Sequence, residues 1–76
     1  MNNITAESID KLTLVDRALV KYPKAKRIAV ANFTSGYNSL TMEASMNLEM
    51  DAGLYKWNSQ TVAAIRWVLN QKARGN

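Results

Sequence analysis

Basic side chains gather in one short stretch of this sequence, and their spacing suggests recognition of an anion. Four cations lie within seven residues around Pro23, with Tyr22 beside them: Lys21, Lys24, Lys26 and Arg27. Cations this close together neutralise neighbouring phosphates of a nucleic acid, and a tyrosine ring can stack on a base. The alternative is a solvated connector whose lysines keep a loop in water. No signature of a known nucleic-acid-binding fold accompanies the cluster, so its signal is electrostatic only.

A second candidate site surrounds Trp67. On a helical wheel Trp67 lies well away from the apolar positions of its segment, among the polar residues Arg66, Asn70 and Arg74. A large aromatic side chain beside arginines is typical of a protein interface, because Trp and Arg carry much of the binding energy there. The alternative is that Trp67 covers the edge of a sheet or packs on the first helix.

Cysteine and histidine are both absent from the chain. Their absence removes disulfides, the usual ligands of zinc and haem, the usual acid and base near neutral pH, and the strongest nucleophile. The remaining carboxylates are Glu7, Asp10, Asp16, Glu43, Glu49 and Asp51. We therefore expect no enzymatic activity, no metal site and no cofactor.

Size and charge restrict the protein further. A chain of 76 residues has room for one domain, over residues 1–76, with one small core. Its net charge of +4 favours an acidic partner without identifying one. No apolar run approaches the ~18 residues that cross a bilayer, and residues 1–4 lack the basic and apolar regions of a signal peptide. We expect a cytoplasmic protein that does not contact a membrane.

The clearest structural signal is a strict alternation over residues 40–50. Apolar residues occupy every second position, namely Leu40, Met42, Ala44, Met46, Leu48 and Met50, and polar residues stand between them. A period of two is the geometry of a β-strand, whose successive side chains point to opposite faces. The alternation therefore predicts a long strand over residues 39–50 with its methionines facing the core.

The remaining segments complete a predicted α+β fold. Apolar spacing predicts helices over about residues 5–22 and 59–74. A short apolar run predicts a strand over residues 26–33, joined by a turn to the long strand as an antiparallel hairpin. A third strand over residues 54–57 is optional, and there we expect Tyr55 and Trp57 to fasten the last helix onto the core. Both helices would cover one face of a twisted antiparallel sheet.

These observations favour a small binding module over an enzyme. The leading hypothesis is a protein-interaction regulator or inhibitor that docks an unidentified partner through the Trp67 helix face or the edge of the long strand. Eleven extended residues reach about 36 Å, longer than residues 26–33 can cover, so the uncovered edge could pair with a second copy as a homodimer. The alternative is a nucleic-acid-binding module that uses the basic cluster.

Overall fold

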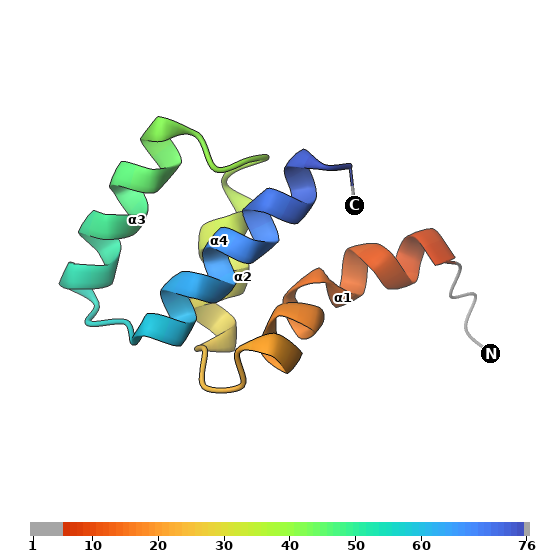
Figure 1. Cartoon of the computed structure of the whole chain (residues 1–76), viewed down its shortest axis with the longest axis horizontal. Helices are drawn as coiled ribbons and strands as arrows, with labels where there is room; N and C mark the ends of the chain where they lie inside the picture. Colours follow the sequence, from red (N-terminus) through yellow and green to blue (C-terminus); the bar gives the residue numbers. More distant parts are fainter. Residues whose placement is uncertain (1–5, 76) are drawn as a thin grey trace.

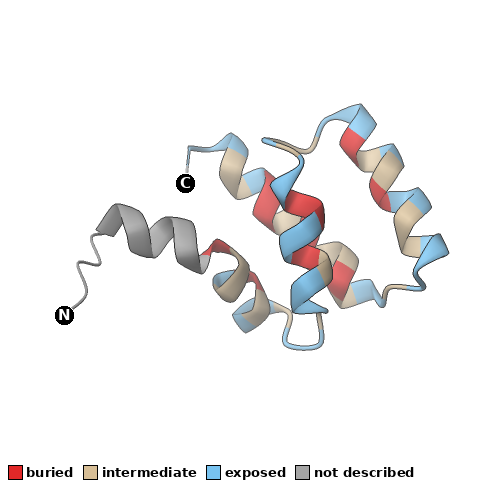
Figure 2. Cartoon of the chain, turned by 180° about the vertical axis from the view of Figure 1, so that it is seen from behind, coloured by how far each residue is buried: buried red, intermediate tan, exposed pale blue. Residues whose placement is uncertain are grey.

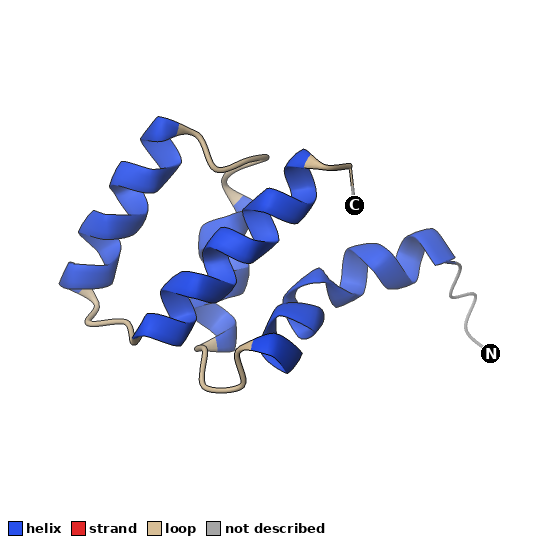
Figure 3. Cartoon of the chain, viewed as in Figure 1, coloured by secondary structure: helices blue, strands red, loops and turns tan. Residues whose placement is uncertain are grey.

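Four α-helices and no strand make up residues 6–75, the part of the chain that this computed structural model describes (Figures 1 and 3). The helices are α1 (Ala6–Lys21), α2 (Arg27–Ser35), α3 (Met42–Leu54) and α4 (Ser59–Ala73). Side chains are described from Leu14 onward.

Helices α1 and α4 occupy the two segments that the sequence predicted to be helical, and the predicted start at residue 5 lies outside the described residues. The predicted α+β fold with an antiparallel sheet is wrong. Helix α2 takes the place of the strand expected at 26–33, and α3 takes the place of the strand expected at 39–50. In place of the optional strand at 54–57 the chain forms the last residue of α3, Leu54, and the turn that leads to α4.

Helix α4 is the centre of the molecule. Helices α1 and α2 pack against it, and α1 and α3 lie on opposite sides of it (Figure 1). Its buried residues recur every three or four positions, which places them on neighbouring faces of one helix: Thr61, Ala64, Ile65, Val68 and Leu69. Among the described side chains, each of the other three helices adds two buried apolar residues to this centre, and Figure 2 shows the buried positions gathered along α4 and the helices that face it.

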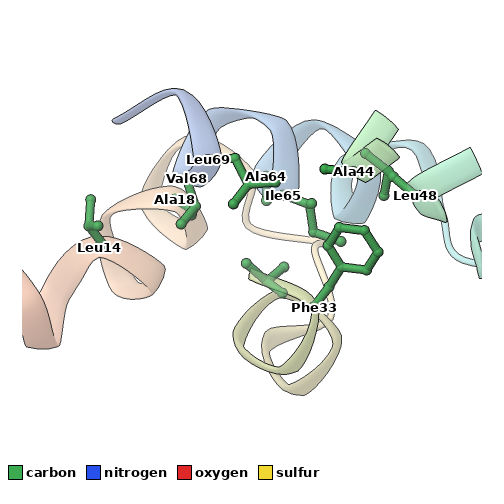
Figure 4. Close-up of a cluster of buried hydrophobic side chains, with 10 residues drawn as sticks. Leu14, Ala18, Phe33, Ala44, Leu48, Ala64, Ile65, Val68 and Leu69 are labelled. Carbon is green, nitrogen blue, oxygen red and sulfur yellow. The ribbon is translucent and has the colours of Figure 1, made fainter. Parts of the chain in front are cut away.

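The alternating segment is helical because its pattern also fits a helix with two apolar stripes. Residues two positions apart on an α-helix are separated by about 200° around the axis, so alternate residues fall on opposite sides. Ala44 and Leu48 form the inner stripe and are fully buried against the core (Figure 4). The outer stripe is 80%, 60% and 67% exposed at Met42, Met46 and Met50. The prediction that these methionines face the core is therefore wrong.

Two further features of this segment favour the helix. No β-branched residue occurs between Met42 and Leu54, and Met, Glu, Ala and Leu are strong helix formers. Thr41 caps the N-terminus, because its side-chain oxygen accepts a hydrogen bond from the backbone N–H of Ala44 at 3.0 Å. Glu43 in the first turn adds a favourable interaction with the helix dipole.

Helix α2 arises from the short apolar run that was predicted to be a strand. Its buried residues Val30, Phe33 and Thr34 are three and four positions apart, as one face of a helix requires. Ile28 lies on the other side and is 74% exposed. A short run that is apolar on both faces fits a buried strand and a helix equally well, and here packing on α4 selects the helix.

Asn58 ties the start of α4 to the connector between α1 and α2. Its side-chain oxygen accepts hydrogen bonds from the backbone N–H and the hydroxyl of Thr61, at 2.7 Å and 2.8 Å. Its side-chain nitrogen donates to the carbonyl of Lys24 at 2.8 Å. The Thr61 hydroxyl oxygen also accepts from the backbone N–H of Lys26 at 2.8 Å. This network fixes where α2 begins.

Replacement of Asn58 by alanine should lower the free energy of unfolding by about 1–2 kcal/mol, because the N-cap of α4 and the link to the connector are lost together. The neighbouring exposed residue offers a matched control, and Ser59→Ala should change the value by less than about 0.5 kcal/mol. Urea titration followed by circular dichroism measures both. Equal losses in the two variants would contradict the role given to Asn58.

Candidate functional site

An apolar pocket of about 920 Å³ opens between the first turns of α2 and the turn that joins α3 to α4. Ile28, Ala29 and Phe33 of α2 form one wall, and Tyr55 and Trp57 form the other. Sequence patterns predicted Ile28, Ala29 and Phe33 on one strand and Tyr55 and Trp57 on an optional third strand, so these residues were not expected to lie together.

Three aromatic rings shape the pocket. The Phe33 and Trp57 rings meet edge to face, with centroids 6.1 Å apart, and Tyr55 stacks on Trp57 at 5.6 Å. Both arrangements are ones that aromatic pairs prefer. Trp57 packs against the core, as expected from the sequence, whereas Tyr55 is 59% exposed. Phe33 lies beside Ile65 in the core (Figure 4), so the pocket has a fixed base and an accessible upper wall.

The backbone of the α3–α4 turn places these aromatic side chains. Lys56 adopts a left-handed conformation with a φ of 56°. The N–H of Trp57 donates to the carbonyl of Ala52 at 3.0 Å, which is the long-range hydrogen bond of a Schellman motif. The chain thus reverses directly after α3 and directs Trp57 back onto Phe33.

Two polar contacts hold α2 and α3 in the positions that form the pocket. The Lys72 ammonium group donates to the carbonyls of Thr34 and Tyr37, at 2.6 Å and 3.1 Å, and so satisfies the C-terminal end of α2. The side-chain nitrogen of Asn47 on α3 donates to the Tyr37 hydroxyl at 2.6 Å. Both contacts converge on the segment between α2 and α3.

The rim of the pocket carries charge. Lys26 and Arg27 stand on the α2 side, and Asp51 stands on the α3 side. Arg27 pairs with Asp16 of α1. Among the side chains that the structure describes, from Leu14 onward, no carboxylate lies within ion-pair distance of Lys26. The α2 side of the pocket is therefore open to a negatively charged group.

The residues predicted to bind nucleic acid lie along the end of α1 and the connector that follows it. The four cations are exposed: Lys21, Lys24, Lys26 and Arg27. Tyr22 is half-buried and packs against the core, so its ring is not a free stacking platform. The cluster is a cationic surface whose last two members also belong to the pocket rim.

The residues predicted around Trp67 are divided between two sides of α4. Trp67 is half-buried, and the Arg17 guanidinium of α1 lies 5.5 Å from its ring centroid, which is the packing on the first helix that the sequence left open. Trp67, Asn70 and Arg74 line a second hollow of about 600 Å³. Arg66 instead faces α3, where its guanidinium lies 3.6 Å from the Glu49 carboxylate.

Large apolar side chains that remain in water are concentrated on α3. In the described part of the chain seven large hydrophobic residues are exposed, and five of them belong to α3 or to the residue that follows it. Four of the five recur at every fourth position and form what we call the methionine stripe, Met42, Met46, Met50 and Leu54. Contiguous exposed apolar surface is typical of an interaction site, and methionine adapts to varied partners. Sequence reasoning missed this stripe because it assigned the methionines to the core.

Other kinds of site find no support in the described residues. No group of three or more acidic, histidine or cysteine side chains is placed to hold a metal ion there. None of the helices in that region is both long and apolar enough to cross a membrane. Comparison with known proteins found no matching family model, curated protein or solved structure.

Proposed function

We propose that this chain is a non-enzymatic protein-binding module that takes an apolar segment of a partner protein into the pocket between α2 and the α3–α4 turn. The main support for this proposal is the aromatic pocket, whose wall residues Ile28 and Tyr55 are 74% and 59% exposed. The pocket and its surroundings combine Phe, Tyr, Trp, Met and Arg, the residues enriched in protein interfaces.

The exposure of the walls favours a macromolecular partner over a small molecule. Sites for small molecules enclose about 70–90% of the ligand surface. The exposure of Ile28 and Tyr55 is typical of an open surface site rather than an enclosed one. A protein segment covers the pocket and its neighbourhood together. Leu54 of the methionine stripe is three positions after the pocket residue Asp51, a spacing that makes two residues neighbours on a helix surface, so such a segment would also meet part of the stripe.

A nucleic-acid partner has weaker support. The exposed cations of the connector remain an electrostatic surface, but Tyr22 is packed against the core and Arg27 is paired with Asp16. Recognition would then rest on phosphate contacts alone, which weaken steeply between about 50 and 200 mM salt. Nucleic-acid binding is therefore an outcome that the experiment below must separate from docking in the pocket.

Within this proposal the chain acts in the cytoplasm as a regulator or inhibitor. It would do so by covering an apolar segment that its partner otherwise uses. A pocket pre-formed by Phe33, Trp57 and the α3–α4 turn suits this role, because little ordering is needed when the partner binds.

Affinity capture with matched variants tests the proposal. The immobilised chain is exposed to lysate of its source cells, with and without nuclease and at two salt concentrations. Ile28→Glu places a charge in the pocket wall. Val20→Glu places the same charge at an 82% exposed apolar position of α1 that does not line the pocket. Circular dichroism of each variant checks that the helices are retained.

Wild type and Val20→Glu should retain the same partner protein, and Ile28→Glu should lose it by at least about tenfold, because a buried unpaired charge is costly. Capture should persist at high salt and after nuclease treatment, since a buried apolar contact is little screened. Equal capture by both glutamate variants would exclude the pocket. Capture that disappears with nuclease or at moderate salt would assign the basic cluster instead.

A further inference from the structure

Helix α3 carries apolar and acidic chemistry and no basic group. Its outer side is the methionine stripe, and its only charged residues are Glu43, Glu49 and Asp51. All ten lysines and arginines of the chain lie outside residues 42–55. Helix α3 is thus an acidic helix with an exposed apolar face, in a protein whose net charge is +4.

The pocket of the same molecule has the complementary chemistry. Its walls are apolar and aromatic, and the α2 side of its rim carries Lys26 and Arg27. Arg27 is paired with Asp16, and Asp51 lies on the opposite, α3 side of the rim. Among the described side chains, Glu49 pairs with Arg66 at 3.6 Å, and its carboxylate side chain is 73% exposed, so this surface pair contributes little and can be exchanged. An incoming copy of α3 would place methionines against the pocket and carboxylates near Lys26.

We propose that two copies of this chain form a two-fold dimer in which the methionine stripe of each α3 packs on the pocket of the other. This dimer rests on the proposed function of the pocket as a docking site, and the occupant of the pocket is α3 of a second copy of the chain. The dimer would keep both pockets covered until a segment of another protein displaces α3.

Two-fold symmetry enlarges the contact that the methionine stripe can make. Met42 and Leu54 are separated by about 18 Å along the helix axis, at 1.5 Å per residue. A single contact between one helix face and one pocket is small for a stable complex, which needs roughly 800 Å² on each partner. Two-fold symmetry uses the stripe and the pocket of both copies and so makes each contact twice.

Sedimentation equilibrium at high micromolar concentration tests the dimer. Wild type and the control Val20→Glu should associate. Met46→Glu, in the middle of the stripe, and Ile28→Glu, in the pocket wall, should each be monomeric, with an association constant lowered by at least about tenfold. Both substituted positions are exposed in the single chain, so the helices should persist by circular dichroism.

Mixing the two monomeric variants gives the sharpest result. Met46→Glu retains a pocket, Ile28→Glu retains a stripe, and a mixed pair therefore keeps one of the two contacts. The mixture should form a heterodimer that is weaker than the wild-type dimer and stronger than either variant alone. A monomeric wild type, a dimer insensitive to both substitutions, or a mixture with no heterodimer would overturn the proposal. Capture of a foreign partner through the pocket by a monomeric wild type would leave the proposed function standing.

Discussion

Replacement of Leu48 by alanine should lower the free energy of unfolding by about 2–5 kcal/mol, whereas Met46→Ala should change it by less than about 0.5 kcal/mol. Leu48 is completely buried against the core, and alanine there leaves a cavity. Met46 is 60% exposed on the outer side of the same helix, where truncation removes little packing. The two residues are only two positions apart, yet they lie on opposite sides of α3.

Urea denaturation of the two variants measures this contrast. In a β-strand, residues 46 and 48 would point to the same face, and both truncations would be costly. Similar losses in the two variants would therefore contradict the helical structure of α3. Met42→Ala extends the test, because residue 42 belongs to the exposed stripe and should behave like residue 46.

Replacement of Tyr55 by alanine should weaken partner binding by about 30-fold, which corresponds to about 2 kcal/mol, with a much smaller effect on stability. Tyr55 stacks on Trp57 and forms the exposed upper wall of the pocket. A large aromatic side chain over a fixed aromatic base is the kind of residue on which interfaces depend most. Isothermal titration calorimetry with the captured partner measures the change in affinity.

Tyr55→Phe is the matched control for this prediction. It retains the ring and its stacking on Trp57 and removes only the hydroxyl, so its affinity should stay within about threefold of wild type. If the Tyr55→Ala variant binds the partner as tightly as the Tyr55→Phe variant, Tyr55 does not contact the partner. The wall of the pocket at the α3–α4 turn then has no role in docking.

The terminal helices were predictable because their patterns allow one interpretation. The last segment repeats apolar residues at helical spacing, and Asn58 directly precedes it as a cap, so α4 was expected almost where it lies. The middle of the chain was different. Its alternation satisfies a strand and a two-stripe helix equally, and the pattern alone does not separate them. The missing β-branched residues and the Thr41 cap indicate the helix.

The candidate site depended on that choice. Ile28, Phe33, Tyr55 and Trp57 become neighbours only when both middle segments are helices and the α3–α4 turn folds back at Lys56. In the predicted antiparallel sheet, the methionines would face the core, and residues 39–50 would expose no apolar surface. The packing of Trp57 on the core was predicted correctly, because it depends only on the position of Trp57 just before a helix. The contacts between α2 and the α3–α4 turn were not predicted, because they depend on the topology of the whole chain.

Trp67 has the neighbours in sequence that are typical of a protein interface, but its side chain packs within its own chain. Trp and Arg side by side are typical of a binding site, yet the arginine that covers Trp67 is Arg17 of α1. Arg66, its neighbour in sequence, faces Glu49 on the other side of α4. The sequence contains the right residue types, but it does not say which helix supplies the partner.

Site-specific cross-linking from position 28 tests the central claim, docking in the pocket, most directly. A photoreactive benzoylphenylalanine replaces Ile28 in one sample and Val20 in a second, and each protein is irradiated in lysate of its source cells before the products are identified by mass spectrometry. Docking in the pocket predicts adducts at position 28 to an apolar segment of one partner protein, or to α3 of a second copy, and none of these at position 20. The same adducts in equal yield from both positions, or protein adducts from position 20 alone, would contradict the claim.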